Sequence, residues 1–263
     1  MKEAYKCALG LMLALTLIGG LACCDGGGGS SGGDGANPVS TVVGSGNIVQ
    51  EPRSVTGATG VDLRGVASLT IEQGAPEELI LQTDDNLMAY ILTDVRGGIL
   101  EIRKDPTVSL RPSRMQGTGI EADLTLSSID SITQSGSGVG GITVSDLTTT
   151  QLELTQSGIG GIDIFNLDAQ TLDVLKSGIG NISVDGQVDD QMITLLGFIG
   201  DYDAEDLSSA TVDVEIAGGG SATVRVSTTL NAHITGSGSV FYHGSPVVTR
   251  TGNGSGSVVQ LSP

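Results

Sequence analysis

Short runs of alternating apolar and polar residues recur along the chain at a fixed spacing. SGVGGITV begins at Ser137, SGIGGIDI at Ser157 and SGIGNISV at Ser177, a constant step of 20. Alternation within a run buries one face of an extended strand. Recurrence between runs stacks like strands on like strands, about 4.8 Å apart. The pattern predicts an all-β fold, a single-stranded parallel β-helix in which no coil is stable alone.

One glycine recurs at the same place in each coil, and we call these residues the marker glycines. From Gly140 to Gly220 they recur at steps of 20, and Gly238 and Gly256 follow at steps of 18. Coils of about 18–20 residues are therefore expected, with a trimmed turn in the last ones. A glycine repeated beside a corner indicates a backbone with φ > 0, so we interpret the column as structural. The predicted inward pairs of the second strand are Leu152/Leu154, Leu172/Val174, Met192/Thr194, Val212/Val214 and Ala232/Ile234.

The region before the repeat is also predicted to form strands. Asp84 to Val95 is interpreted as a strand that ends in a turn at Gly97-Gly98. Arg103 to Arg114, with four basic residues and two prolines, is expected to be a loop. Other short alternating runs predict strands around Val61–Leu63, Leu69–Ile71, Leu79–Leu81, Leu100–Ile102 and Leu124–Leu126.

The N-terminus has the organisation of a bacterial export signal. A basic start precedes an apolar run over residues 8–18, which is shorter than a membrane span. Ala22 before Cys23 resembles a lipobox, so Cys23 is the predicted site of lipid attachment and Cys24 the alternative. The predicted organisation is a lipoprotein signal peptide at 1–22, a Gly/Ser-rich flexible tether at 23–43 and a folded domain at 44–263.

Several stretches resemble a known bacterial family. GSGNI near Gly44, LTIEQG, VRGGILEI and the repeated SG-x-G units are similar to the head GIN domain, whose members are often labelled auto-transporter adhesins. The resemblance covers about Gly44 to Leu261 and implies a right-handed β-helix in the cell envelope. The family repeat is usually SGSGDI, whereas this chain keeps SG-x-G in its first three units and loses it at Gly197–Gly200.

Charge and composition exclude several classes of function. The chain has 12 Lys+Arg against 30 Asp+Glu, a net charge of −18, which disfavours nucleic acid and anionic membrane surfaces as partners. All three cysteines lie at the N-terminus, so the folded part has no disulfide or thiolate metal ligand. Lys176 is the only Lys or Arg between Gly117 and Ser221, which argues against a polysaccharide lyase with a basic groove. We predict no cofactor and no catalytic activity.

One acidic cluster is a candidate metal site. Asp201, Asp203, Glu205 and Asp206 are the densest group of carboxylates and offer oxygen ligands of the kind that calcium prefers. We favour the alternative, a solvated acidic face, because the acidic columns are irregular from coil to coil.

An apolar exception in the outward columns is a candidate contact surface. If the period stays constant through these coils, Leu175, Ile193, Leu195 and Phe198 lie together on the outside of adjacent coils. An exposed apolar cluster on an acidic surface suggests a contact site. The alternatives are a covering loop or a slip of register at this point.

These observations predict a non-catalytic lipoprotein of the cell envelope, anchored at the outer membrane or the periplasmic face. Its β-helix would present a surface for adhesion or self-association. The alternative is a module that binds glycans or cell-wall fragments along one face, while a polysaccharide-active enzyme is disfavoured. The expected partners are the membrane, through the N-terminal lipid, and further copies of the chain or a cell-surface protein or glycan.

Overall fold

The protein is described here by a computed structural model that places residues 40–65, 67–114, 118–197 and 199–262. Within these ranges the regular structure is β, apart from one 3-10 helix, η1 (Met88–Tyr90). The strands are β1 (Ser40–Val43), β2 (Ile48–Arg53), β3 (Gly60–Arg64), β4 (Ser68–Gln73), β5 (Glu78–Asp84), β6 (Ile91–Arg96), β7 (Ile99–Lys104), β8 (Val108–Arg111), β9 (Glu121–Leu126), β10 (Ser131–Gln134), β11 (Ile142–Ser145), β12 (Thr148–Gln156), β13 (Ile162–Lys176), β14 (Ile182–Leu195), β15 (Tyr202–Ile216), β16 (Ala222–Ile234), β17 (Val240–His243), β18 (Val247–Thr251) and β19 (Val258–Ser262).

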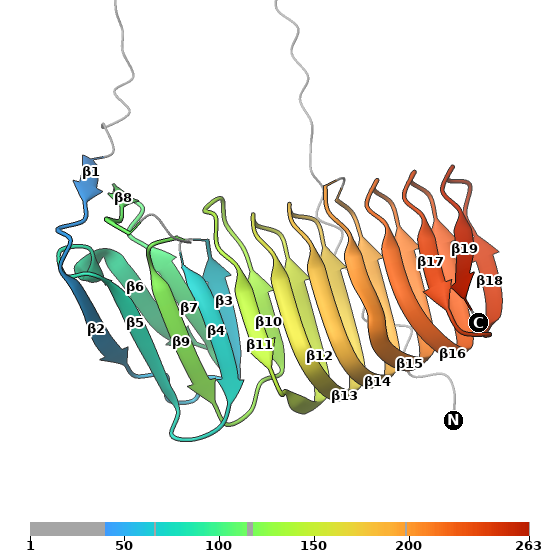
Figure 1. The fold of residues 1–263 in the computed structure, drawn as a ribbon, viewed down its shortest axis with the longest axis horizontal. Coiled ribbons are helices and arrows are strands. Elements are labelled where there is room, and N and C mark those ends of the chain that lie inside the picture. Colours follow the sequence, from blue (N-terminus) through green and yellow to red (C-terminus); the bar gives the residue numbers. More distant parts are fainter. Residues whose placement is uncertain (1–39, 66, 115–117, 198, 263) are drawn as a thin grey trace, which may run out of the picture. The chain divides into compact units, whose positions relative to one another are not determined.

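Parallel stacking of successive coils confirms the predicted β-helix. Ile142 pairs with Ile162, and the same column continues through Ile182, Tyr202 and Ala222 at steps of 20. From Ala222 the column continues at steps of 18 through β17 and β19. Figure 1 shows these coils side by side, from β10 to β19.

The strands before the repeat extend the same stack. β3 pairs in parallel with β10, and β4 with β11, so Val61 and Leu69 occupy the aliphatic columns of the later coils. β7 and β9 add one further parallel layer, on β3 and β4. Beyond that layer the pairing becomes antiparallel, with β6 on β7, β5 on β9 and β2 on β5. These antiparallel strands form the N-terminal end of the stack in Figure 1.

Two boundaries differ from those expected. Asp84 to Val95 is not one strand, because η1 separates the end of β5 from β6; the turn at Gly97-Gly98 is confirmed. The predicted loop from Arg103 to Arg114 contains β8, which pairs in parallel with β1. Since β1 consists of Ser40–Val43, the last four residues of the predicted tether also form a strand. The signal peptide, Cys23 and the rest of the tether lie outside the described residues.

The glycine column is explained by close stacking. A Cβ on Gly160, Gly180 or Gly238 would overlap the carbonyl oxygen of the marker glycine one coil earlier. The predicted positive φ is found at Gly160, Gly180 and Gly200. It is not found at Gly140, Gly220, Gly238 or Gly256, where close approach alone excludes a side chain.

The predicted register is wrong in β14. Ile164 pairs with Val184 at a step of 20, but Leu167 pairs with Gly186 at a step of 19. A shift of one residue moves every following side chain to the other face of the strand. Ile193 therefore pairs with Val174 and is 0% exposed, and Leu195 pairs with Lys176 and is 1% exposed.

The inward pair of this strand is accordingly Gln191 and Ile193, not Met192 and Thr194. β15 regains the missing residue, since Gly186 pairs with Leu207 at a step of 21. In β16 the shift is two residues, so Val212 pairs with Leu230 and the faces are preserved.

Candidate functional site

The structure breaks up the predicted contact surface. Ile193 and Leu195 are in the core, so their assignment to the outside is wrong, and Phe198 lies outside the described residues. Leu175 is exposed as expected, and Met192 takes the outward position that had been given to Ile193, with 58% of its surface exposed. These two side chains line a shallow hollow of about 280 Å³ on β12–β14.

A longer apolar surface follows the turns between coils. The third residue of SG-x-G is Val139, Ile159, Ile179 or, in the altered unit, Ile199, and single parallel bridges join these residues from coil to coil. Three of them are strongly exposed, at 70% for Val139, 44% for Ile179 and 57% for Ile199. We call these four residues the turn ridge; their turns lie in a row in Figure 1. The signal in the sequence that could have identified it was an aliphatic residue directly before the marker glycine of each of these four turns; in the first three units this residue also follows a glycine.

Buried donors hold the backbone beneath the turn ridge. Gln134, Gln156 and Lys176 form one inward column at the ends of β10, β12 and β13. Gln134 Nε2 donates to the carbonyl oxygen of Ile159 (2.6 Å), and Lys176 Nζ donates to that of Ile199 (3.0 Å). The corresponding donor, Gln156 Nε2, binds the carbonyl oxygen of Gly160. These bonds tie the backbone of the turns to the core beneath the aliphatic side chains.

Lys176 is therefore a structural cation. Its side chain is buried, and desolvation lowers the pKa of its ammonium below the ordinary 10.5, while Asp201 partly opposes that shift. Among the described residues no carboxylate lies within ion-pair distance of it. The single cation of this region thus serves the core and is not offered to a substrate.

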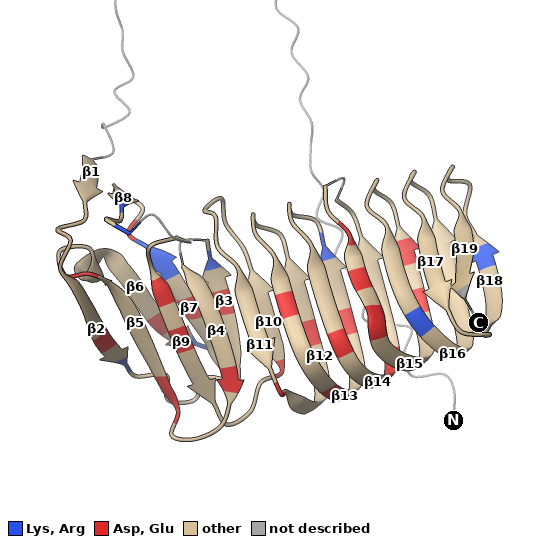
Figure 2. Ribbon diagram, viewed as in Figure 1, with Lys and Arg blue, Asp and Glu red and all other residues tan. Residues whose placement is uncertain are grey.

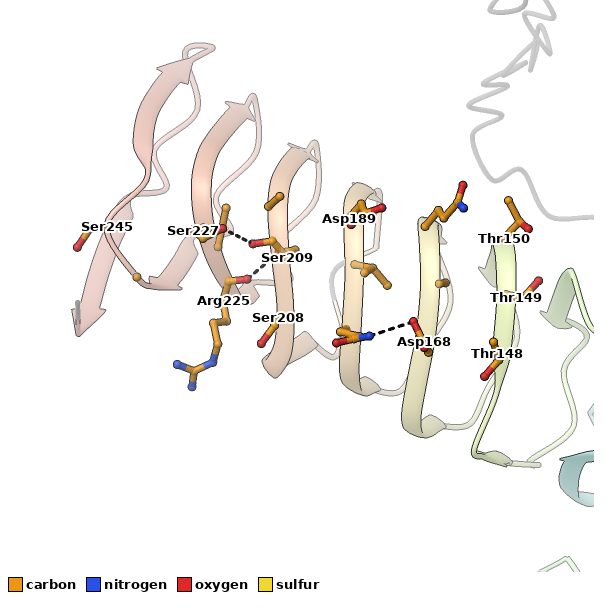
Figure 3. Close-up of a pocket in the computed structure, with 17 residues that line it drawn as sticks. Thr148, Thr149, Thr150, Asp168, Asp189, Ser208, Ser209, Arg225, Ser227 and Ser245 are labelled. Carbon is orange, nitrogen blue, oxygen red and sulfur yellow. Dashed lines mark hydrogen bonds between the residues drawn. The ribbon is translucent and has the colours of Figure 1, made fainter.

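A polar groove of about 1040 Å³ runs across the middle of the coils. Its floor is a column of small side chains, in which Thr149 pairs with Ala169, Ala169 with Val188, and Ser209 with Val226. Because these side chains are small, they leave the space above them unfilled. The irregular pairing of β13–β16 also bends the strands at this place. Figure 3 shows the lining residues arranged across successive strands, from Thr148 to Ser245.

The rim of the groove carries polar groups with unused hydrogen-bonding capacity. Within the described part of the chain, no hydrogen bond or ion pair engages the exposed side chains of Gln170, Asp189 and Ser208. Asp168 accepts a hydrogen bond from Gln187 Nε2 (3.2 Å). The guanidinium of Arg225 is tied to the carbonyl oxygen of Glu205 (2.7 Å). The groove therefore offers hydroxyls, amides and carboxylates but no mobile cation.

The acidic cluster does not form a set of metal ligands. Asp201 accepts a hydrogen bond from the backbone N–H of Ser221, and Asp203 accepts one from that of Glu205. Glu205 and Asp206 face different partners, His243 and Arg225, each at 3.9 Å. Among the described residues no three His, Cys, Asp or Glu side chains are grouped to hold a metal ion. The calcium alternative is therefore not supported by the geometry.

No helix in the described part of the chain is long and apolar enough to cross a membrane.

Comparisons with known proteins agree with this architecture. A "putative adhesin" from Bacteroides fragilis has a similar structure, with a TM-score of 0.77 and 23% identity over 84% of this chain and 100% of that one. A "Putative lipid binding protein" from Parabacteroides distasonis has a TM-score of 0.66 and 23% identity over 84% and 99%. A "putative adhesin" from the same organism has a TM-score of 0.65 and 20% identity over 84% and 100%. At this identity the likenesses establish the fold. No curated protein matches the chain.

A family model described as "Putative auto-transporter adhesin, head GIN domain" matches residues 58–246. The match begins just before β3, so it leaves out β1 and β2, and it extends through most of the coils as far as the loop after β17. The chain belongs to the head GIN domain family.

Proposed function

We propose that the protein is a non-catalytic module of the bacterial cell envelope that adheres by self-association through the turn ridge. The observation that carries this proposal is the alignment of four aliphatic side chains on rigid turns, most of them strongly exposed. Contiguous exposed apolar surface on a soluble domain is typical of contact sites. The adhesin label of the family is consistent with this role.

A second copy of the chain is the partner that fits the ridge best. The turns 135–141, 157–161, 177–181 and 196–200 contain no Asp, Glu, Lys or Arg, although the chain has a net charge of −18. Figure 2 shows these loops without charged residues, above strands that carry many acidic ones. Two copies repel each other least along such a strip, and the same apolar strip on each copy is self-complementary.

The geometry also favours binding over catalysis. The groove holds Asp168 and Asp189 but no histidine and no unattached cation. A lyase needs a basic group at the bond that it breaks, and a glycosidase needs a carboxylic acid and a carboxylate on either side of that bond. Asp168 is held by Gln187, and most of the lining consists of hydroxyls, amides and small aliphatic side chains, which suit binding. We therefore assign the outer surface to recognition.

We further propose that lipid on Cys23 holds the module at the membrane, with the segment before Ser40 as its tether. The predicted signal peptide and the cysteine of the lipobox support this anchoring. The test is metabolic labelling with a fatty acid: we expect label on the wild-type chain and none on Cys23→Ser. Label retained by Cys23→Ser but lost in Cys24→Ser would move the anchor to the second cysteine.

Self-association is tested by light scattering on the full chain without its signal peptide. We expect concentration-dependent oligomers in the wild type and monomers in the double variant Ile179→Asp/Ile199→Asp. Ser183→Asp, at an outward position of β14 whose side chain has no hydrogen bond to the described residues, is the control for an added carboxylate and should still associate. A monomeric wild type, or unchanged oligomers in the double variant, would refute the role of the ridge. Leu195→Asp is not a suitable test, because Leu195 is in the core.

A further inference from the structure

We propose that the polar groove on β12–β16 binds one strand of a neutral polysaccharide, laid across the coils. The groove is a second surface, formed by a different segment of each coil from the one that carries the turn ridge. The proposal therefore does not depend on self-association. It assigns the glycan-binding alternative to a defined site.

The geometry of the groove suits a polymer. It crosses five consecutive coils and ends in the turn at Gly244 and Ser245, so its length follows the stacking direction. Parallel strands repeat about every 4.8 Å along this direction, and each of the five coils contributes three consecutive residues to the lining. An extended polymer can thus contact several coils at once, through different side chains on each.

The chemistry of the lining suits sugar hydroxyls. Each hydroxyl of a sugar can both donate and accept a hydrogen bond. The rim offers amides and hydroxyls, which also donate and accept, and carboxylates, which accept. Gln170, Asp189 and Ser208 lie on three successive coils and have no partner within the described residues. Ala169 and Val188, each with a small exposed fraction, supply an apolar floor against which the C–H faces of a sugar can pack.

A peptide strand fits the same groove less well. Extended peptides are bound mainly by adding a strand to an open sheet edge. Here the strands run across the groove, and β13, β14 and β15 are each paired on both sides. The backbone therefore has few free groups to offer, and the floor has no deep apolar pocket for an anchoring side chain.

Charge restricts the ligand to a neutral class. The lining has two carboxylates, Asp168 and Asp189, and the one cation, Arg225, is bound to the backbone and lies near Asp206. An anionic polysaccharide would meet these carboxylates and the field of a chain with a charge of −18. Uncharged hexose or N-acetylhexosamine polymers meet no such repulsion.

Among the described residues the lining contains no aromatic side chain on which a sugar ring could stack. Each sugar unit must then contribute little, and useful affinity requires contacts with several coils at once. We expect affinity to increase with oligosaccharide length until the groove is filled. A site for a single sugar, in contrast, would show no such dependence.

The experiment uses the full chain, without its signal peptide, on an array of neutral and anionic glycans and a library of extended peptides. We expect hits confined to neutral glycans, followed by calorimetry in which affinity rises from disaccharide to hexasaccharide. Ser208→Trp fills the groove from an exposed position and should weaken binding by about tenfold or more. Ser183→Trp, on another segment of a neighbouring coil, is the matched control and should bind as the wild type does.

Several outcomes would overturn the proposal. They are hits only among anionic glycans or peptides, no neutral glycan bound, an affinity independent of length, or equal binding by Ser208→Trp. The variant Ile179→Asp/Ile199→Asp should keep full glycan binding, because it alters only the turn ridge. Loss of self-association and loss of glycan binding can therefore be distinguished.

Discussion

At the scale of the residue, each marker glycine can be tested separately for its intolerance of a side chain. Gly180 has φ of +127°, and a Cβ there would overlap the carbonyl oxygen of Gly160. We expect Gly180→Ala to lower the free energy of unfolding by about 1–3 kcal/mol, because it combines backbone strain with a steric clash. Urea denaturation measures the difference.

Gly161→Ala provides the control. Its Cβ would lie 3.5 Å from the nearest atom, the carbonyl oxygen of Asn181, and the next coil already has Asn181 at the equivalent position. We expect a change within about 0.5 kcal/mol. Equal losses in both variants would show that stacking of the marker column is not what excludes a side chain.

The buried position of Lys176 leads us to expect that the stability of the protein depends on pH. Its pKa is lowered in the folded state by desolvation, so the folded protein binds this proton less tightly than the unfolded chain does. Stability therefore rises with pH from the lowered pKa up to the ordinary 10.5, where the side chain becomes neutral in both states. Lys176→Gln keeps an amide donor, as in Gln134 and Gln156, without the charge.

We expect Lys176→Gln to be more stable than the wild type at pH 7, by about 1 kcal/mol. The difference should shrink as the pH approaches 10.5. Parallel urea titrations of the two proteins at several pH values measure it, since other titrating groups cancel. A difference that is constant with pH would mean that the buried ammonium is not desolvated in the folded state.

At the scale of the strand, two substitutions in β14 test which of its side chains point into the core. Ile193 is in the core and Met192, its neighbour, is 58% exposed. Ile193→Asp should lower the free energy of unfolding by about 3 kcal/mol or more, because it buries an unpaired charge. Met192→Asp, with the same introduced group at the adjacent position, should change it by less than about 1 kcal/mol. Thermal and urea unfolding measure the stability of the two variants. A larger loss in Met192→Asp than in Ile193→Asp would mean that Met192 points inward, as a constant period of 20 predicts.

This strand also shows what could be predicted from the sequence. The period of 20 was sufficient to predict the fold, the coil length and the columns of aliphatic residues and glycines, because burial repeats from coil to coil. The slip in β14 could not be located, since Met192 and Ile193 are both apolar and alternation does not choose between them. One residue is lost within β14, between Val184 and Gly186, and regained within β15, before Leu207, so the pattern on either side stays in phase.

The two surfaces differ in how far they could be foreseen. The turn ridge could be predicted from the sequence as an aliphatic residue directly before a glycine of each of its coils, but the buried column of Gln134, Gln156 and Lys176, which bonds to the backbone of its turns, could not. The groove has no sequence motif. It arises where small residues such as Ala169 and Ser209 coincide with bends in consecutive strands, which only the packed coils bring together.

At the scale of the whole molecule, net charge and the turn ridge act in opposite directions. A charge of −18 would keep copies apart, whereas the proposed contact along the uncharged, apolar turn ridge would bring them together. Salt screens the repulsion, because the Debye length falls from about 30 Å at 0.01 M to about 10 Å at 0.1 M, and it leaves apolar contact in place. Self-association should therefore strengthen as salt is raised, and sedimentation velocity over this range measures it.

Binding of a neutral oligosaccharide serves as an internal reference in the same samples. It involves no change in charge, so its affinity should stay nearly constant while the oligomers grow. Ile179→Asp/Ile199→Asp should remain monomeric at every salt concentration, because screening cannot replace the missing apolar contact. Association that weakens with salt would instead indicate ion pairs between copies, formed by the Arg-bearing strands near the N-terminal end of the stack. In that case the turn ridge would not be the contact surface.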